Sequence, residues 1–150
     1  MNVYLDSSFV IRQLLGVRPK CPFWGTWEKA YASTMMRTEC FRAANLLRLN
    51  GKIDDDQRAR LGAWIEKVVS SVTQVPVTDA ILRRAAETFP VAVGTLQGLH
   101  LATLLELQTV HGITCSLATD DKQLLQAAMA LGFAEAAAEQ PAPAADKTSA

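Results

Sequence analysis

The apolar residues of the chain follow two spacings that alternate along its length. Short runs rich in β-branched and aromatic residues occupy residues 2–5, 31–34, 72–77 and 113–118. After each run, apolar residues recur about every three to four positions, as in helices that bury one face. Strands that alternate with helices are typical of a largely parallel sheet covered by helices on both faces, so we predict an α/β fold.

Several of the predicted helices carry start or stop signals. Asn50-Gly51 is expected to end the helix that follows the second strand, and the carboxylates of residues 54–56 suit the positive dipole end of the next one. Thr78 is suited to cap the helix after the third strand. The helix that opens at residues 54–56 has an apolar stripe that we expect to face the core: Leu61, Trp64, Ile65 and Val68.

Two segments lack this periodicity. Residues 16–26 contain several glycines and prolines, which predict a loop that tucks Trp24 and the nearby Trp27 against the body and borders a site. Beyond Phe133 the chain turns to Ala, Glu, Gln, Pro and Ser. We therefore predict one domain over residues 1–133 and an Ala/Pro-rich tail over residues 134–150, disordered from about residue 138.

Composition limits the classes of function. The 150 residues are 49% apolar, and 15 basic residues balance 15 acidic ones, so the chain does not have the field of a protein that coats nucleic acid. Any RNA binding must be local. The three cysteines lack the short spacings of zinc sites and are expected to be reduced. No run of about 18 apolar residues occurs, so we expect a cytoplasmic protein without a membrane span.

Two kinds of side chain have open roles in RNA binding. Arginines can form a phosphate-binding rim, because the guanidinium group matches phosphate oxygens, or they can be scattered solvated charges. The two readings are equally supported for Arg12, Arg37, Arg42 and Arg48. Tryptophans can stack on bases or pack into the core. Core packing is favoured for Trp64, and the role of Trp24 and Trp27 stays open.

Carboxylates stand where the predicted strands end. Asp6 ends the first strand, Asp120-Asp121 follows the last one, and Glu39 lies near the start of a helix after a short strand. In a parallel sheet, ligands gather at the carboxyl ends of the strands, so these acids are expected to converge. Clustered carboxylates repel one another unless a cation joins them, and Mg²⁺ or Mn²⁺ is the natural partner.

Each acid also has a simpler structural explanation. Asp6, with Ser7 and Ser8 beside it, can cap the first helix, and Glu39 can be a solvated first-turn acid. Of the last pair, we favour Asp121 as the ligand and Asp120 as an auxiliary residue or cap. His100 is predicted to be a buried, hydrogen-bonded core residue rather than a general base, and His111 a loop residue.

Four motifs in order along the chain carry a family resemblance. They are Val-Tyr-Leu-Asp6-Ser-Ser, Ser33-x5-Glu39, Thr95-Leu-Gln-Gly-Leu-His-Leu-Ala102 and Ala118-Thr-Asp-Asp121-Lys-Gln-Leu. With these motifs, which span residues 2 to about 133, the chain resembles PIN-domain proteins of the VapC toxin type. The resemblance implies a three-layer α/β/α sandwich, Mg²⁺-dependent endoribonuclease activity, a role as toxin in a type II toxin–antitoxin system, a cognate antitoxin and a homodimer.

The resemblance also assigns roles to individual residues. Asp6, Glu39 and Asp121 match the family's metal-site acids, and Thr119 matches its nearby hydroxyl residue. Gln97 departs from the pattern, because the family usually has aspartate there. A glutamine removes one negative charge and adds an amide donor, so metal affinity is expected to fall. The neighbouring Gly98 is expected to loosen the helix start by roughly 1 kcal/mol relative to alanine.

Three functions follow from these residues. The first is a metal-dependent ribonuclease in which Asp6, Glu39 and Asp121 hold Mg²⁺, or Mn²⁺, and Gln97 assists weakly. The second is a catalytically weakened PIN-fold protein that binds RNA or an antitoxin partner without efficient cleavage. The third, a DNA nuclease, ranks lower because the chain has no basic arm or added DNA-binding module.

Overall fold

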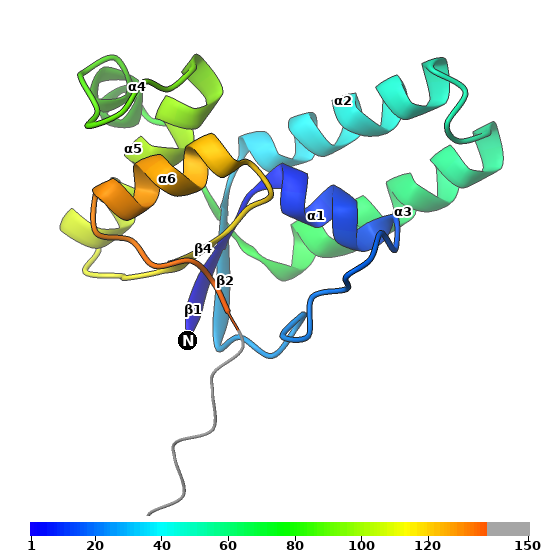
Figure 1. Cartoon of the computed structure of the whole chain (residues 1–150), viewed down its shortest axis with the longest axis horizontal. Helices are drawn as coiled ribbons and strands as arrows, with labels where there is room; N and C mark the ends of the chain where they lie inside the picture. The colour runs from blue at the N-terminus through cyan, green and yellow to red at the C-terminus, as the bar shows by residue number, and fades with distance from the viewer. Residues whose placement is uncertain (138–150) are drawn as a thin grey trace, which may run out of the picture.

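A parallel sheet forms the centre of the molecule. The computed structural model describes residues 1–137, and Figure 1 shows the sheet with helices on either side of it. The strand order is β3-β2-β1-β4, and every pairing is parallel. The strands are β1 (Asn2–Leu5), β2 (Lys29–Ser33), β3 (Thr73–Val75) and β4 (Ser116–Ala118). The predicted sheet is confirmed, although β3 and β4 are shorter than the apolar runs that contain them.

Helices cover both faces of the sheet and complete a three-layer α/β/α sandwich. Side chains from α1, α2 and α3 form one core with the sheet, and side chains from α4, α5 and α6 form the other. Figure 1 shows the two groups of helices separated by the strands. Their bounds are α1 (Ser7–Leu14), α2 (Met35–Leu49), α3 (Asp55–Ser71), α4 (Asp79–Ala85), α5 (Thr95–Thr109) and α6 (Lys122–Ala130).

Alternation along β1 explains why there are two cores. Val3 and Leu5 are buried against α1, α2 and α3, whereas Tyr4 between them is buried against the opposite group. Successive side chains of a strand point to opposite faces, and here both faces are covered. β1 is therefore apolar and buried from Val3 to Leu5, and polarity returns directly after it, at Asp6.

The helix signals in the sequence are largely confirmed. Asp54 forms a capping box with Gln57, and the Thr78 hydroxyl accepts the backbone N–H of Ile81 at 3.3 Å. The prediction for Trp64 is wrong, because its side chain is 53% exposed and packs under Lys67. The buried stripe of α3 is narrower than expected and leaves Trp64 at its edge.

The segment after α6 returns to the sheet. Leu117 of β4 donates to Ala134 at 2.8 Å and accepts from Ala136 at 2.8 Å, and Ala136 is buried. Contacts with the sheet therefore reach beyond the domain boundary expected after Phe133. The predicted disorder from about residue 138 concerns residues outside those that the structure describes. None of the helices within residues 1–137 is long and apolar enough to cross a membrane.

Gly98 lies where α5 passes close to the end of α4. A Cβ atom at this position would lie 3.2 Å from the backbone oxygen of Ala85, which cannot rotate away. Gly98→Ala is therefore expected to lack the usual gain of about 1 kcal/mol for alanine in a helix. Gly62→Ala in α3 is the matched control, because its close neighbour is the flexible end of Arg58. Chemical denaturation of both variants tests this; equal stabilisation would contradict it.

Candidate metal centre

Asp6 is a buried carboxylate at the carboxyl edge of the sheet. It follows β1 directly, occupies the N-cap position of α1 and is 4% exposed. Its side chain makes no capping hydrogen bond to the backbone N–H groups of the helix that it precedes. The capping explanation for Asp6 is therefore not supported, and its carboxylate is available for other contacts.

Two hydroxyl groups fix one oxygen of Asp6. Thr119 donates to Asp6 Oδ2 at 2.8 Å, and Ser8 donates to the same oxygen in a short hydrogen bond. Thr119 can reach Asp6 because β4 pairs with β1 in a register that sets Ala118 beside Leu5. With Oδ2 held in this way, the second oxygen, Oδ1, faces the remaining members of the cluster.

Glu39 and His100 complete a three-residue cluster with Asp6. Glu39 comes from α2 and His100 from α5, which lie on opposite faces of the sheet. The His100 Nε2 atom lies 3.4 Å from Asp6 Oδ1 and 3.2 Å from Glu39 Oε1. One potential ligand atom from each residue lies within 4.8 Å of the other two.

The cluster places a buried imidazole against two acidic side chains. Burial opposes a charge on His100, but its hydrogen bond to Glu39 and the charges of Asp6, Glu39 and Asp121 outweigh that effect and raise the pKa of His100. A proton on His100 is therefore favoured by the acids around it. Glu39 Oε2 is nevertheless buried without a hydrogen-bond partner among the described residues. A buried, unpaired carboxylate oxygen fits a site for a divalent cation.

Asp121 stands beside this cluster with both oxygens engaged. Its Oδ1 accepts the backbone N–H groups of Gln123 at 2.9 Å and Leu124 at 3.0 Å, and thereby caps α6. Its Oδ2 accepts the side-chain amide of Gln97 at 2.7 Å. Burial disfavours the charge, yet these hydrogen bonds dominate and lower the pKa of Asp121. The carboxylate is ionised and has its partners already.

The side chain of Gln97 hydrogen-bonds both to the start of its own helix, α5, and to residues at the start of α6. Its Oε1 accepts the backbone N–H of Gly94 at 2.7 Å, and its amide nitrogen donates to Asp121 and, at 3.2 Å, to Gln123. An aspartate at this position could not donate to Asp121. In this chain the residue at the position expected to carry a metal-site acid therefore donates a hydrogen bond to the neighbouring acid.

The structure brings the predicted site residues to one sheet edge in two groups. Asp6 and Glu39 belong to the cluster, with Thr119 bonded to Asp6, whereas Asp121 and Gln97 bind each other next to it. The prediction that Asp120 caps α6 is wrong, because Asp121 is the N-cap; its alternative role as an auxiliary residue stays a prediction.

Two contributors were not predicted as part of the site. His100 is buried and hydrogen-bonded as expected, but its partners are site carboxylates. The available signal was its position one helical turn after Gln97. Ser8 was considered only as a cap, and its bond to Asp6 depends on the turn between β1 and α1.

The four arginines do not form one rim. Arg12 pairs with Asp120 at the edge of the site. Arg37 pairs with Glu66, and Arg48 with Asp55, so both are committed to contacts between α2 and α3. Of these three arginines, Arg12 is the one whose ion pair lies beside the carboxylates, and for Arg37 and Arg48 the structure supports the alternative of ordinary surface charges.

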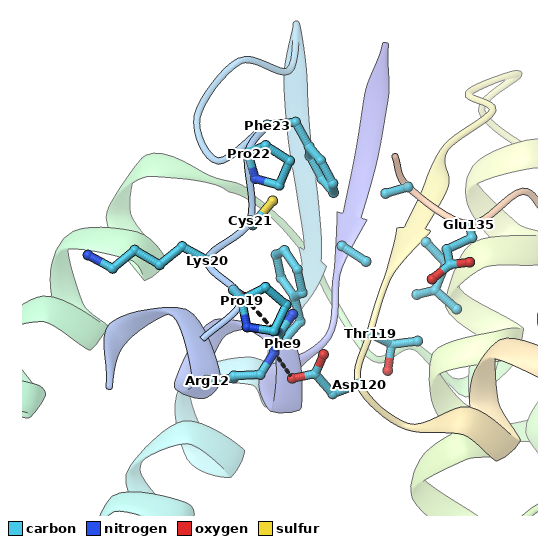
Figure 2. A pocket seen from close by; sticks show the side chains of 13 residues that line it. Phe9, Arg12, Pro19, Lys20, Cys21, Pro22, Phe23, Thr119, Asp120 and Glu135 are labelled. Carbon is cyan, nitrogen blue, oxygen red and sulfur yellow. Dashed lines mark hydrogen bonds and ion pairs between the residues drawn. The ribbon is translucent and has the colours of Figure 1, made fainter. Parts of the chain in front are cut away.

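A cavity of about 220 Å³ adjoins the centre. Figure 2 shows it between α1, the end of β4 and the loop over residues 16–26. Phe9 and Phe23 provide aromatic walls, Arg12 and Lys20 provide positive charge, and Thr119 is shared with the metal centre. The loop over residues 16–26 therefore lines this cavity, with Phe23 rather than a tryptophan in the pocket wall.

The fold resembles that of a toxin of known structure. The structure of VapC20 from Mycobacterium tuberculosis, described as a toxin that cleaves the sarcin–ricin loop, matches with a TM-score of 0.58 and 16% sequence identity; the match covers 90% of this chain and 98% of that one. No family model matches the chain, and no curated protein matches its sequence. At this identity the likeness shows the fold alone, and the predicted PIN-like three-layer sandwich is confirmed.

Proposed function

We propose that this chain is a metal-dependent endoribonuclease of the toxin type. The observation that carries the proposal is the buried pair Asp6 and Glu39, with one unpartnered oxygen, at the carboxyl edge of a parallel sheet. The fold shared with VapC20, a toxin described as cleaving the sarcin–ricin loop, supports the choice of RNA as substrate. Mg²⁺ or Mn²⁺ is the expected ion.

The residues of the centre would bind and orient the reacting groups. The hydroxyls of Ser8 and Thr119 hold Asp6 so that Oδ1 faces Glu39, and the buried walls limit the access of bulk water. A bound divalent ion would supply a Lewis acid for the phosphate and a water of lowered pKa. Arg12, at the edge of the same site, is placed to contact a neighbouring phosphate once RNA competes with Asp120.

Gln97 supports a second candidate function. Its amide occupies an oxygen of Asp121 that would otherwise be free to bind metal. A centre with fewer available carboxylates binds Mg²⁺ more weakly. The second candidate is therefore a PIN-fold protein that binds RNA or an antitoxin partner and cleaves slowly. Binding to an antitoxin and homodimer formation are part of both proposals.

A cleavage assay on matched RNA and DNA tests the first proposal. The substrates are a sarcin–ricin-loop RNA, an unrelated hairpin RNA and DNA of the same sequences, each with Mg²⁺, with Mn²⁺ or with EDTA. We expect metal-dependent cleavage of at least one RNA, its loss in EDTA and no cleavage of DNA. Cleavage that persists in EDTA would contradict the metal centre, and RNA binding without cleavage would favour the second candidate.

Cys21 provides a test of whether RNA uses the adjoining cavity. Burial raises the pKa of all three thiols, to about 12 for Cys40 and about 11 for Cys115. Cys21 lines that cavity and is partly exposed, whereas the other two cysteines are buried. Iodoacetamide is expected to modify Cys21 alone. The added carboxamidomethyl group would fill space that an RNA base would occupy, so we expect RNA binding to weaken by about tenfold. Mass spectrometry and fluorescence anisotropy measure the two effects.

Cys21→Ser protein treated with the same reagent is the control and is expected to keep its affinity. If modified Cys21 leaves RNA binding unchanged, the cavity is not part of the RNA-binding surface.

A further inference from the structure

We propose that His100 is itself a metal ligand, so that the centre consists of Asp6, Glu39 and the imidazole of His100 and favours a first-row transition-metal dication over Mg²⁺. The inference rests on the proposed function only in placing an ion at this edge of the sheet. It concerns how this chain holds that ion, which can be measured without RNA.

The ring nitrogen of His100 lies where a ligand atom is needed. Nε2 is 3.4 Å from Asp6 Oδ1 and 3.2 Å from Glu39 Oε1, and His100 is 2% exposed. An ion bound to both carboxylate oxygens would therefore lie within reach of Nε2 after small side-chain adjustments.

Tyr4 holds the imidazole ring in the required orientation. Its hydroxyl oxygen lies 2.8 Å from His100 Nδ1. Coordination through Nε2 requires the tautomer with its hydrogen on Nδ1, and the Tyr4 oxygen can accept that hydrogen. Histidine ligands in proteins almost always donate their second ring N–H to such a partner.

The environment of Asp121 explains why the centre would need a nitrogen ligand. The backbone of α6 and the amide of Gln97 take up both of its oxygens. With glutamine at position 97 and the acid at position 121 engaged, Asp6 and Glu39 are the two carboxylates of the cluster. Among the described residues, His100 is the third member of the only cluster of metal-binding side chains.

This ligand set predicts a particular metal preference. Mg²⁺ prefers oxygen ligands in near-ideal octahedral geometry and releases its waters reluctantly. Imidazole favours transition metals, and mixed sets of imidazole and carboxylate bind such ions with open positions for water or substrate. Mn²⁺ is a useful probe because it accepts carboxylates, tolerates imidazole and is paramagnetic. We expect it to bind at least about tenfold more tightly than Mg²⁺.

Electron spin-echo spectroscopy of Mn²⁺ bound to the full chain tests the ligand directly. A coordinated imidazole gives nitrogen modulation that changes when the protein carries ¹⁵N-labelled histidine. The chain has two histidines, and the other one, His111, is exposed. We expect the label-dependent signal in the native protein and in His111→Gln, and its loss in His100→Gln. Bound Mn²⁺ without this modulation in the native protein would overturn the proposal.

Calorimetric titration supplies the second readout. His100→Gln is expected to lower Mn²⁺ affinity by at least about tenfold, while His111→Gln leaves it unchanged. Mg²⁺ affinity is expected to change by less than about threefold in His100→Gln, since oxygen ligands suffice for that ion. Thermal unfolding checks that each variant is folded, and the label experiment on native protein remains decisive if His100→Gln is not.

The outcomes separate this proposal from the proposed ribonuclease activity. RNA cleavage with no histidine signal from bound Mn²⁺ would keep the enzyme and reject the ligand. A histidine signal without RNA cleavage would keep the ligand and favour a binding role. Failure of the native protein to bind Mn²⁺ would overturn the ligand assignment.

Discussion

Asp6→Asn is expected to lower metal-dependent RNA cleavage by at least about 100-fold. The substitution keeps the size of the side chain but removes a charge from the residue that Ser8, Thr119 and His100 surround. Its amide nitrogen would be directed either at the hydroxyl donors or into the cluster, and neither orientation reproduces the carboxylate. Single-turnover cleavage at saturating Mn²⁺ measures the loss.

The matched control for Asp6→Asn is Asp56→Asn. Asp56 is an exposed acid in the first turn of α3, remote from the carboxyl edge of β1. Asp56→Asn changes the net charge by the same amount without altering the metal centre, so the cleavage rate of this variant should match that of the native protein. If Asp6→Asn cleaves as fast as Asp56→Asn, Asp6 has no role in catalysis.

Gln97→Asp is expected to raise Mg²⁺ affinity by about tenfold or more and to destabilise the metal-free protein by about 1 kcal/mol. The variant adds a carboxylate and releases one oxygen of Asp121 from the amide that now holds it. Without a cation, two carboxylates then face each other, and with Mg²⁺ both can coordinate it. Calorimetry measures the affinity, and thermal unfolding with and without Mg²⁺ measures the stability.

Gln97→Asn separates charge from chain length. It shortens the side chain as aspartate does, and so weakens the same contact with Gly94, but it adds no charge. We expect it to lose stability without gaining Mg²⁺ affinity. Equal Mg²⁺ affinity in Gln97→Asp and Gln97→Asn would show that position 97 does not contribute to metal binding.

Most of the fold follows from local patterns in the sequence. The spacing of Val3, Tyr4 and Leu5 identifies a strand buried on both faces, and the side chains of Asp54 and Thr78 mark helix starts that the structure shows. Trp64 shows a burial prediction that a local pattern gets wrong. Its helical spacing matches the stripe of α3, but which edge of that stripe is covered depends on how α1 and the loop over residues 16–26 pack, which no local pattern contains.

The site could be predicted in part for a similar reason. Asp6 and Glu39 follow adjacent parallel strands, so topology alone brings them together. The choice between Asp120 and Asp121 depends on the backbone dihedral angles at the start of α6, where neighbouring residues point in different directions. The part played by His100 depends on the approach of α5 to α2 past the end of the sheet, and a buried histidine does not reveal its partners in the sequence.

The three residues of the cluster come from three different layers of the sandwich. Asp6 belongs to the end of the sheet, Glu39 to the helices on one face and His100 to the helices on the other. An ion bound by all three would link the three layers of the domain to one another. At a concentration 100 times its dissociation constant, it would add about 2.7 kcal/mol to the free energy of unfolding. The lifetime of this protein in a cell would then depend on the supply of metal as well as on its sequence.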